Sequence, residues 1–259
     1  YANPARQNVL EQIQKVVKDP VDIRSDIARL RMVKQPAEIT AIQKAVDITA
    51  DTMAEVKSRL SNFKNEKEVE RAVSAGFFAH GGDGHGYEPI IASGGNAATL
   101  HYMKNNQDLE DSTLLLLDVG ANYAGYSADI SRVWAIGTPT DRQKEIFDAV
   151  LQIQQKALDV LKPGMLVKEF QHQMEEYAFK VQRKIHVDID RYPHGFSHFL
   201  GLDVHDAGDY TIPLQEGTVL TVEPGIYLAD EGIGVRIEDD VLITKSGIKN
   251  LSEKIPKTL

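Results

Sequence analysis

Residues 114–120 read Leu-Leu-Leu-Leu-Asp-Val-Gly, and the chain returns at residues 126–134 as Tyr-Ser-Ala-Asp-Ile-Ser-Arg-Val-Trp. Because every neighbour of Asp118 is apolar, the first stretch predicts a buried strand that carries a carboxylate into the core. The turn-like residues between the two stretches predict a hairpin that would place Asp118 and Asp129 side by side. Two adjacent buried carboxylates repel, so they share a proton, pair with arginine or bind a cation. Taken alone, the pair favours a simpler interpretation, two solvated aspartates at strand ends.

Residues 193–206 hold three of the chain's eight histidines, His194, His198 and His205, among glycines and apolar residues. A single histidine is usually structural. Three histidines within twelve residues of an apolar loop instead favour metal-ligand or acid/base roles.

Two further apolar strands each contain a glutamate, Glu223 in residues 219–227 and Glu238 in residues 234–241. By strand alternation Arg236 shares a face with Glu238 and can help to hold that carboxylate ionised. For either glutamate alone, a charge on an edge strand is an adequate interpretation. Four acids and one histidine on strands or a glycine-rich loop, taken together, are the ligand set expected of a two-cation site. Oxygen-dominated ligation favours a hard divalent ion, with manganese preferred and cobalt, iron or zinc as alternatives.

The rest of the chain predicts both helices and strands. Helices are expected over residues 4–18, from Pro36 to about residue 60, over 66–79, from a capping box at Thr140 and Gln143 to Pro163, and over 166–183. Pro20 is expected to end the first helix and to be followed by a linker. Strands are expected over 88–92, 113–119, 126–136, 218–228 and 233–244. This order predicts an α+β domain with a curved, mainly antiparallel sheet covered by helices.

The composition excludes several classes of protein. The chain has 259 residues and a net charge of −9, so it has no general attraction for nucleic acid or for an anionic membrane. It contains no cysteine, which excludes disulfides and thiolate metal sites and leaves the cytoplasm as the default location. The first residues do not resemble a signal peptide, and the longest apolar run, residues 114–117, is too short to cross a bilayer.

The four blocks that carry these acids and histidines resemble the pita-bread metallopeptidases. This is the family of methionine aminopeptidase, Xaa-Pro aminopeptidase (aminopeptidase P) and Xaa-Pro dipeptidase (prolidase). The resemblance extends over roughly residues 31–259 and implies the pita-bread fold for that range. It also implies that two divalent metal ions are held by five ligands, which are Asp118, Asp129, His198, Glu223 and Glu238.

The resemblance implies roles for further residues. The histidines expected to contact substrate are His101, His194 and His205, and the residues expected to support the metals from behind are Tyr227 and Arg236. Asp129 and Glu238 are expected to bridge the two ions, which would activate a shared water. Glu223 is expected to take the proton of that water and pass it to the leaving proline nitrogen.

Residues 194–206 are similar to the proline-specific branch of the family, because methionine aminopeptidase lacks the upstream histidine and the Leu-Gly-Leu-Asp-Val-His-Asp run. Creatinase shares the fold but lacks the complete metal set. A dipeptidase needs a cation for the free carboxylate of its substrate, and no lysine or arginine occurs between His205 and Arg236. The sequence therefore favours a Xaa-Pro aminopeptidase, with a Xaa-Pro dipeptidase as the main alternative. A non-catalytic peptide-binding module or a structural domain fits the intact ligand set less well.

Both proline-specific branches usually carry a separate domain before the catalytic one. We therefore expect residues 1–30 to be the helix and linker remnant of such a domain, and residues 31–259 to be the catalytic domain. The expected partners are peptides with proline at the second position, and a homo-oligomer is expected when the N-terminal domain is present.

Overall fold

The structure is a computed structural model that describes residues 4–18, 21–189 and 191–259. The helices are α1 (Pro4–Gln14), α2 (Arg24–Met32), α3 (Pro36–Ser58), α4 (Glu66–Ala79), α5 (Asp141–Val160) and α6 (Val167–Lys184), with short 3₁₀ helices at Leu60–Asn62, Gly94–Ala98 and Ala229–Glu231. The strands are β1 (Gly84–His85), β2 (Ile90–Ser93), β3 (Thr113–Val119), β4 (Ala121–Tyr123), β5 (Tyr126–Ser127), β6 (Ile130–Ile136), β7 (Val219–Val222), β8 (Gly225–Leu228), β9 (Ile233–Arg236), β10 (Asp239–Ile243) and β11 (Ile248–Asn250). All strand pairings are antiparallel. The predicted α+β fold is confirmed.

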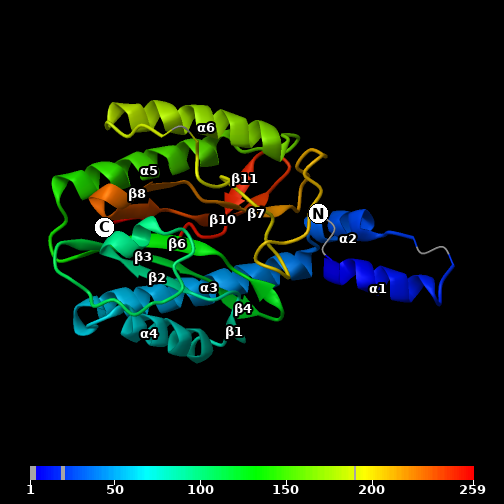
Figure 1. Cartoon of the computed structure of the whole chain (residues 1–259), viewed down its shortest axis with the longest axis horizontal. Helices are drawn as coiled ribbons and strands as arrows, with labels where there is room; N and C mark the ends of the chain where they lie inside the picture. Colours follow the sequence, from blue (N-terminus) through cyan, green and yellow to red (C-terminus); the bar gives the residue numbers. More distant parts are fainter. Residues whose placement is uncertain (1–3, 19–20, 190) are drawn as a thin grey trace.

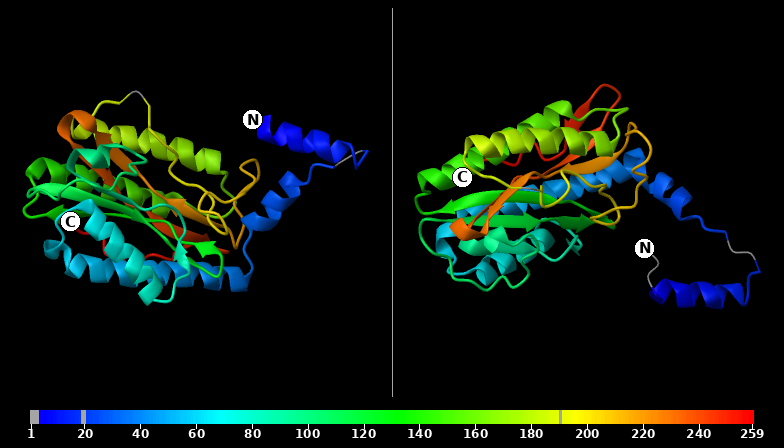
Figure 2. Two further views of the ribbon diagram at one scale, coloured as in Figure 1. Left: turned by 60° about the horizontal axis from the view of Figure 1, so that its bottom comes forward. Right: turned by 45° about the horizontal axis from the view of Figure 1, so that its top comes forward.

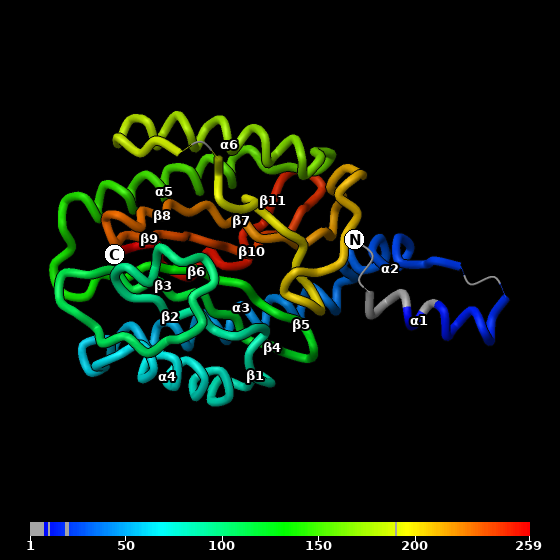
Figure 3. Tube along the Cα trace, viewed as in Figure 1, coloured from blue at the N-terminus to red at the C-terminus, as the bar shows by residue number. Residues whose placement is uncertain are grey.

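The strands form a central layer between two pairs of helices (Figure 1). Helices α3 and α4 lie on one side of it, and α5 and α6 lie on the other (Figure 1). The Cα trace shows α2 continuing from the start of α3 away from the strands (Figure 3). In the part of the chain that the structure describes, no helix is both long and apolar enough to span a membrane.

Most helix boundaries follow the local sequence signals. Pro36 occupies the first turn of α3, and the Thr140 hydroxyl accepts a hydrogen bond from the Gln143 amide at the start of α5, as the capping box predicts. The predicted range of α4 is confirmed. The linker predicted after the first helix is wrong where α2 forms, and α1 ends at Gln14 instead of near residue 18. Pro20, the predicted helix breaker, lies outside the described residues.

Strand β3 is buried on both faces, which explains its continuous apolar sequence. Leu115 and Leu117 pack in a cluster with α3 and α4 residues, whereas Leu114 and Leu116 belong to a second cluster that includes α5 and α6 residues. Because side chains alternate along a strand, Asp118 shares its face with Leu114 and Leu116. The strand thereby directs one carboxylate into the interior.

Three strands that the sequence predicts as continuous are each interrupted at an acidic residue. Asp129 lies between β5 and β6, Glu223 between β7 and β8, and Glu238 between β9 and β10. The pairing of β7 with β10 and that of β8 with β9 have one common register. Glu223 and Glu238 therefore lie opposite each other where the ladder is interrupted. The predictions of unbroken strands over 126–136, 218–228 and 233–244 are wrong at these positions.

A buried ion pair joins the strands behind this gap. The guanidinium of Arg132, on β6, donates to the Asp239 carboxylate over 2.7 Å and to the Glu238 backbone carbonyl over 2.7 Å. Both side chains are almost fully buried. Lys257 and Gln154 also donate to Asp239, so this carboxylate links β6, β10, α5 and the C-terminal segment.

We expect Asp239→Asn to destabilise the fold strongly, because it leaves the buried charge of Arg132 without its partner. Removing one member of a buried pair costs about 3–5 kcal/mol. Urea unfolding followed by circular dichroism measures this difference. The matched control is Asp141→Asn, which removes a fully exposed partner of Lys144 and should change stability by less than about 0.5 kcal/mol. Equal effects of the two substitutions would contradict the role given to the buried pair.

Candidate metal centre

A cavity of about 490 Å³ gathers nearly all of the predicted site residues. Those that line it are His101, Asp118, Asp129, His194, His198, His205, Glu223, Arg236 and Glu238. The remaining one, Tyr227 on β8, lies behind the cavity wall, where its hydroxyl is hydrogen-bonded to His194 over 2.9 Å. Residues that are far apart in the sequence thus converge on one place.

One tyrosine hydroxyl joins the first two carboxylates. The hydroxyl of Tyr87, in the loop between β1 and β2, lies 2.6 Å from Asp118 Oδ1 and 2.7 Å from Asp129 Oδ1. The hairpin places the two acids close together, as predicted, but Asp118 pairs in register with Ser131 instead of Asp129. Burial raises the pKa of Asp118, although the nearby charge of Arg236 opposes this shift.

The two glutamates project from the gap in the β7–β10 ladder. The backbone amide of Glu223 donates to the Phe196 carbonyl, and that of Glu238 donates to the Ser131 carbonyl, both over 3.1 Å. The glutamate backbones therefore bond outward to neighbouring segments and not to each other. Like charges directly opposite each other in a ladder are destabilising, so this arrangement needs compensation from elsewhere.

The positive charge of Arg236 mainly offsets the negative charge of Asp118. Its Nη2 donates to Asp118 Oδ2 over 2.5 Å, its Nη1 to the Tyr227 hydroxyl over 2.9 Å, and its Nε to Ser131 Oγ over 2.8 Å. The same Ser131 hydroxyl donates to Glu238 over 2.7 Å. The predicted ion pair between Arg236 and Glu238 is long, with 3.9 Å between Nε and Oε2. The reason is that the two residues do not lie on one regular strand. Arg236 therefore reaches Glu238 chiefly through Ser131.

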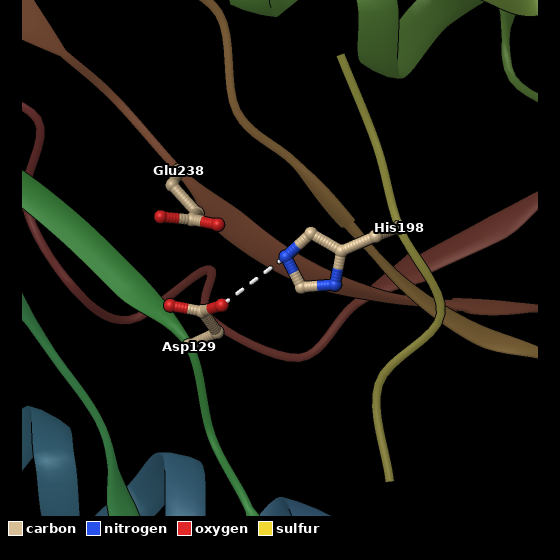
Figure 4. Close-up of side chains that lie close together, drawn as sticks. All are labelled: Asp129, His198 and Glu238. Carbon is tan, nitrogen blue, oxygen red and sulfur yellow. Dashed lines mark ion pairs between the residues drawn. The ribbon is translucent and has the colours of Figure 1, made fainter. Parts of the chain in front are cut away.

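Figure 4 shows the imidazole of His198 facing the carboxylates of Asp129 and Glu238. Its Nε2 lies 3.3 Å from Asp129 Oδ2 and 3.4 Å from Glu223 Oε1. One ligand atom each from Asp129, His198 and Glu238 lie within 4.8 Å of one another, which is close enough to share an ion. Burial lowers the pKa of His198, but the bond to Asp129 and the charge of Glu223 outweigh it and raise the pKa to about 9.

The charge balance tests whether a metal fits here. Burial, together with the charge of Asp129 and other carboxylates, raises the pKa of Glu238 well above its ordinary value. Burial likewise raises the pKa of Glu223 to about 7, although His198 opposes the shift. Arg236 and a protonated His198 neutralise at most two of the four carboxylates. An oxygen-rich donor set with this excess of negative charge fits a hard divalent cation.

The other histidines differ in how firmly they are held. His194 Nδ1 lies 2.7 Å from the Gly195 carbonyl, so Nδ1 carries the proton and Nε2 accepts from Tyr227. Burial lowers the pKa of His194 to about 4, which keeps the ring neutral. His101 and His205 are exposed at the rim, and the His205 ring lies edge-on to that of His198, with centroids 4.3 Å apart.

Sequence reasoning missed Tyr87 and Ser131. Ser131 could have been found by alternation, because it lies two residues after Asp129 on the same face of the chain. Tyr87 carries no such signal, since it lies 31 residues before Asp118 and contacts it only through the fold.

Comparisons with known proteins agree with this geometry. The model of metallopeptidase family M24 matches residues 40–245. The Xaa-Pro aminopeptidase of Escherichia coli K12 is 34% identical over 292 residues, covering 99% of this chain and 66% of the relative. The Xaa-Pro dipeptidase of Pyrococcus furiosus is 35% identical over 246 residues, covering 92% of this chain and 68% of the relative. A solved structure of aminopeptidase P from E. coli superposes with a TM-score of 0.87 at 32% identity, covering 92% of this chain and 60% of that one. The chain thus spans a little under two thirds of the length of the E. coli relative.

We expect Tyr87→Phe to weaken metal binding at this centre by about ten- to a hundredfold, as loss of a hydrogen bond to metal-binding groups commonly does. Titration of Mn²⁺ by calorimetry measures the affinity. The matched control is Tyr177→Phe, which removes a hydroxyl that bonds Gln152 on the outer helices. If both variants bound Mn²⁺ as the wild type does, Tyr87 would have no role in arranging the carboxylates.

Proposed function

The chain belongs to metallopeptidase family M24, and from this premise we propose that it releases an N-terminal residue from peptides with proline at the second position. The observation that carries the proposal is the convergence of four carboxylates and His198 on one cavity, with three further histidines around it. The relatives include Xaa-Pro aminopeptidases and Xaa-Pro dipeptidases, and the names of both kinds specify proline at the second position.

In this proposal Asp118, Asp129, His198, Glu223 and Glu238 would hold two divalent ions. The ions would supply Lewis acidity, polarising the substrate carbonyl and lowering the pKa of a water. The expectation of manganese stays a prediction, as do the cytoplasmic location, the domain boundary at residues 30 and 31, and assembly into a homo-oligomer.

The protein's own side chains would handle the proton and the substrate. Glu223 would take a proton and deliver it to the leaving nitrogen, because it lies in the cavity wall with Oε2 3.7 Å from His194 Nδ1. His194 is fixed by Gly195 and Tyr227, which suits a wall that orients the substrate. His205 and His101, at the rim, would stabilise negative charge as it develops on the carbonyl oxygen.

The proline preference has a physical basis. A prolyl nitrogen has no hydrogen, and its ring fixes φ, so an enzyme for this bond needs an apolar wall and a proton for the tertiary nitrogen. Leu100, Pro193 and Tyr210 add such surface beside the histidines. The acidic interior favours the free amino group of the substrate, which would restrict cleavage to the N-terminus.

A dipeptidase remains the second candidate because dipeptidases occur among the relatives. Two observations favour the aminopeptidase. No lysine or arginine occurs between His205 and Arg236. Within the described ranges Arg236 is the one lysine or arginine that lines the cavity, and its three donor groups are already bonded to Asp118, Tyr227 and Ser131. A dipeptide's carboxylate would therefore find no free lysine or arginine side chain in the described lining.

We predict that Asp129→Asn abolishes binding of at least one of two metal ions, because a charged ligand carboxylate becomes a neutral amide. Elemental analysis after equilibration with Mn²⁺ and gel filtration gives the stoichiometry. Asp148→Asn on the exposed side of α5 is the control and should keep the wild-type metal content. A wild-type protein that retains no Mn²⁺ under these conditions would contradict the proposed centre.

For substrate length, we predict that kcat/KM is higher for a Xaa-Pro-Yaa tripeptide than for the matched Xaa-Pro dipeptide, both measured with Mn²⁺. The reason is the missing clamp for the dipeptide carboxylate. Strict preference for the dipeptide would make the chain a dipeptidase. Cleavage of Met-Ala peptides without cleavage of Xaa-Pro peptides would overturn the proline-specific assignment.

A further inference from the structure

The loop that carries His205 is fastened to the segment before α3 by ion pairs. Between α6 and β7 the described part of the chain contains neither a helix nor a named strand, so the rim loop, residues 201–209, has little regular structure of its own. Figure 2 shows this region lying beside the junction of α2 and α3. Three basic residues at this junction, Arg29, Arg31 and Lys34, each pair with an acid in the rim loop.

Arg31 grips the rim loop on both sides of His205. Its Nη2 lies 2.6 Å from Asp203 Oδ2 and is also bonded to Asp206 Oδ1. Asp203 lies two residues before His205, and Asp206 lies one residue after it. A single guanidinium group therefore spans the turn that presents the histidine to the cavity. Both bonds come from the same nitrogen, Nη2, which carries two hydrogens and can donate one to each carboxylate.

Lys34 supports the same carboxylate from within. Its Nζ lies 3.1 Å from Asp206 Oδ2, and both side chains are only 1% exposed. A Cβ on Gly201 would collide with the Asp206 carboxylate and come within 2.9 Å of Lys34 Cε, so the glycine leaves the room that this pair needs. Buried charges persist only when they are paired, which makes Asp206 a firm anchor for the loop.

We propose that Arg31, supported by Lys34, is a positioning residue that holds His205 at the rim of the cavity. This inference rests on the proposed function, in which His205 acts on the substrate. Arg31 touches neither the metal-binding carboxylates nor the cavity, so its effect on the reaction must pass through the rim loop. The segment before α3 then helps to hold the rim loop of the site in place.

A double-mutant cycle tests whether Arg31 acts through His205. We expect Arg31→Met to lower kcat on a Xaa-Pro-Yaa peptide by about tenfold or more, as a small misplacement of a reacting group does, with unchanged Mn²⁺ content. In a His205→Ala background the same substitution should have almost no further effect, because the group that it positions is gone. Arg31→Lys should restore part of the activity. The control Arg24→Met removes an exposed charge of the same segment that pairs with Asp22, and its kcat should equal that of the wild type.

A second measurement reports on the loop without activity. Because the chain has no cysteine, Leu202→Cys provides a single attachment point for a spin label on an exposed residue of the rim loop. The label should be more mobile in the Arg31→Met variant than in the labelled parent, and unchanged with Arg24→Met. The same comparison with Lys34→Met tests the inner pair, provided that the variant's circular dichroism shows that it folds.

The two measurements separate the failure of this inference from the failure of the proposed function. A wild type that cleaves no Xaa-Pro peptide would refute the function, while the spin label would still report whether Arg31 orders the loop. Unchanged label mobility would overturn the positioning role. So would a loss of kcat from Arg31→Met that is as large with His205→Ala as without it, because such additivity means that Arg31 acts by another route.

Discussion

Mutual repulsion among buried carboxylates is the constraint on which the rest of this structure depends. Asp118, Asp129, Glu223 and Glu238 face one cavity, where their negative charges lie close together and are largely removed from water. Their partners within the protein include the hydroxyls of Tyr87, Ser131 and Thr221, the guanidinium of Arg236 and the imidazole of His198. These partners do not balance the charge. The arrangement is therefore one that a divalent cation would complete, because its charge would offset the remaining carboxylates.

The interrupted strands follow from the same constraint. A regular ladder fixes where each side chain points and directs the backbone amides to the neighbouring strands. At Glu223 and Glu238 the amides bond instead to Phe196 and Ser131, which belong to other segments. The backbone at the two glutamates is therefore held by the segment of Phe196 and by strand β6, in addition to the strands that carry the glutamates. Behind this gap Arg132 donates to the Glu238 carbonyl, and this bond holds the backbone of Glu238 in place close to the other carboxylates.

How far the sequence predicts this structure depends on how local each signal is. The capping residues of α5 and the range of α4 depend on neighbours a few positions apart, and both predictions are confirmed. Helix α2 was missed because its apolar residues Ile27 and Leu30 stay exposed and form no buried stripe. The acids could be named from their apolar surroundings. The strand breaks could not, because an apolar run does not reveal that an amide bonds to a distant segment. Tyr87 could not be predicted either, because it contacts Asp118 only through the fold.

Four basic residues in the cavity wall, behind the strands and below the rim pair with carboxylates of the protein itself. Arg236 serves Asp118, Arg132 serves Asp239 behind the strands, and Arg31 and Lys34 serve Asp206 below the rim. Each of these cations is at least partly buried, so releasing one to meet a substrate would leave a carboxylate unpaired in the interior. The scaffold that holds the acidic centre in place therefore also limits what can bind there. With these cations paired, the unbalanced charge of the lining is acidic, and it favours a positively charged ligand such as a divalent ion.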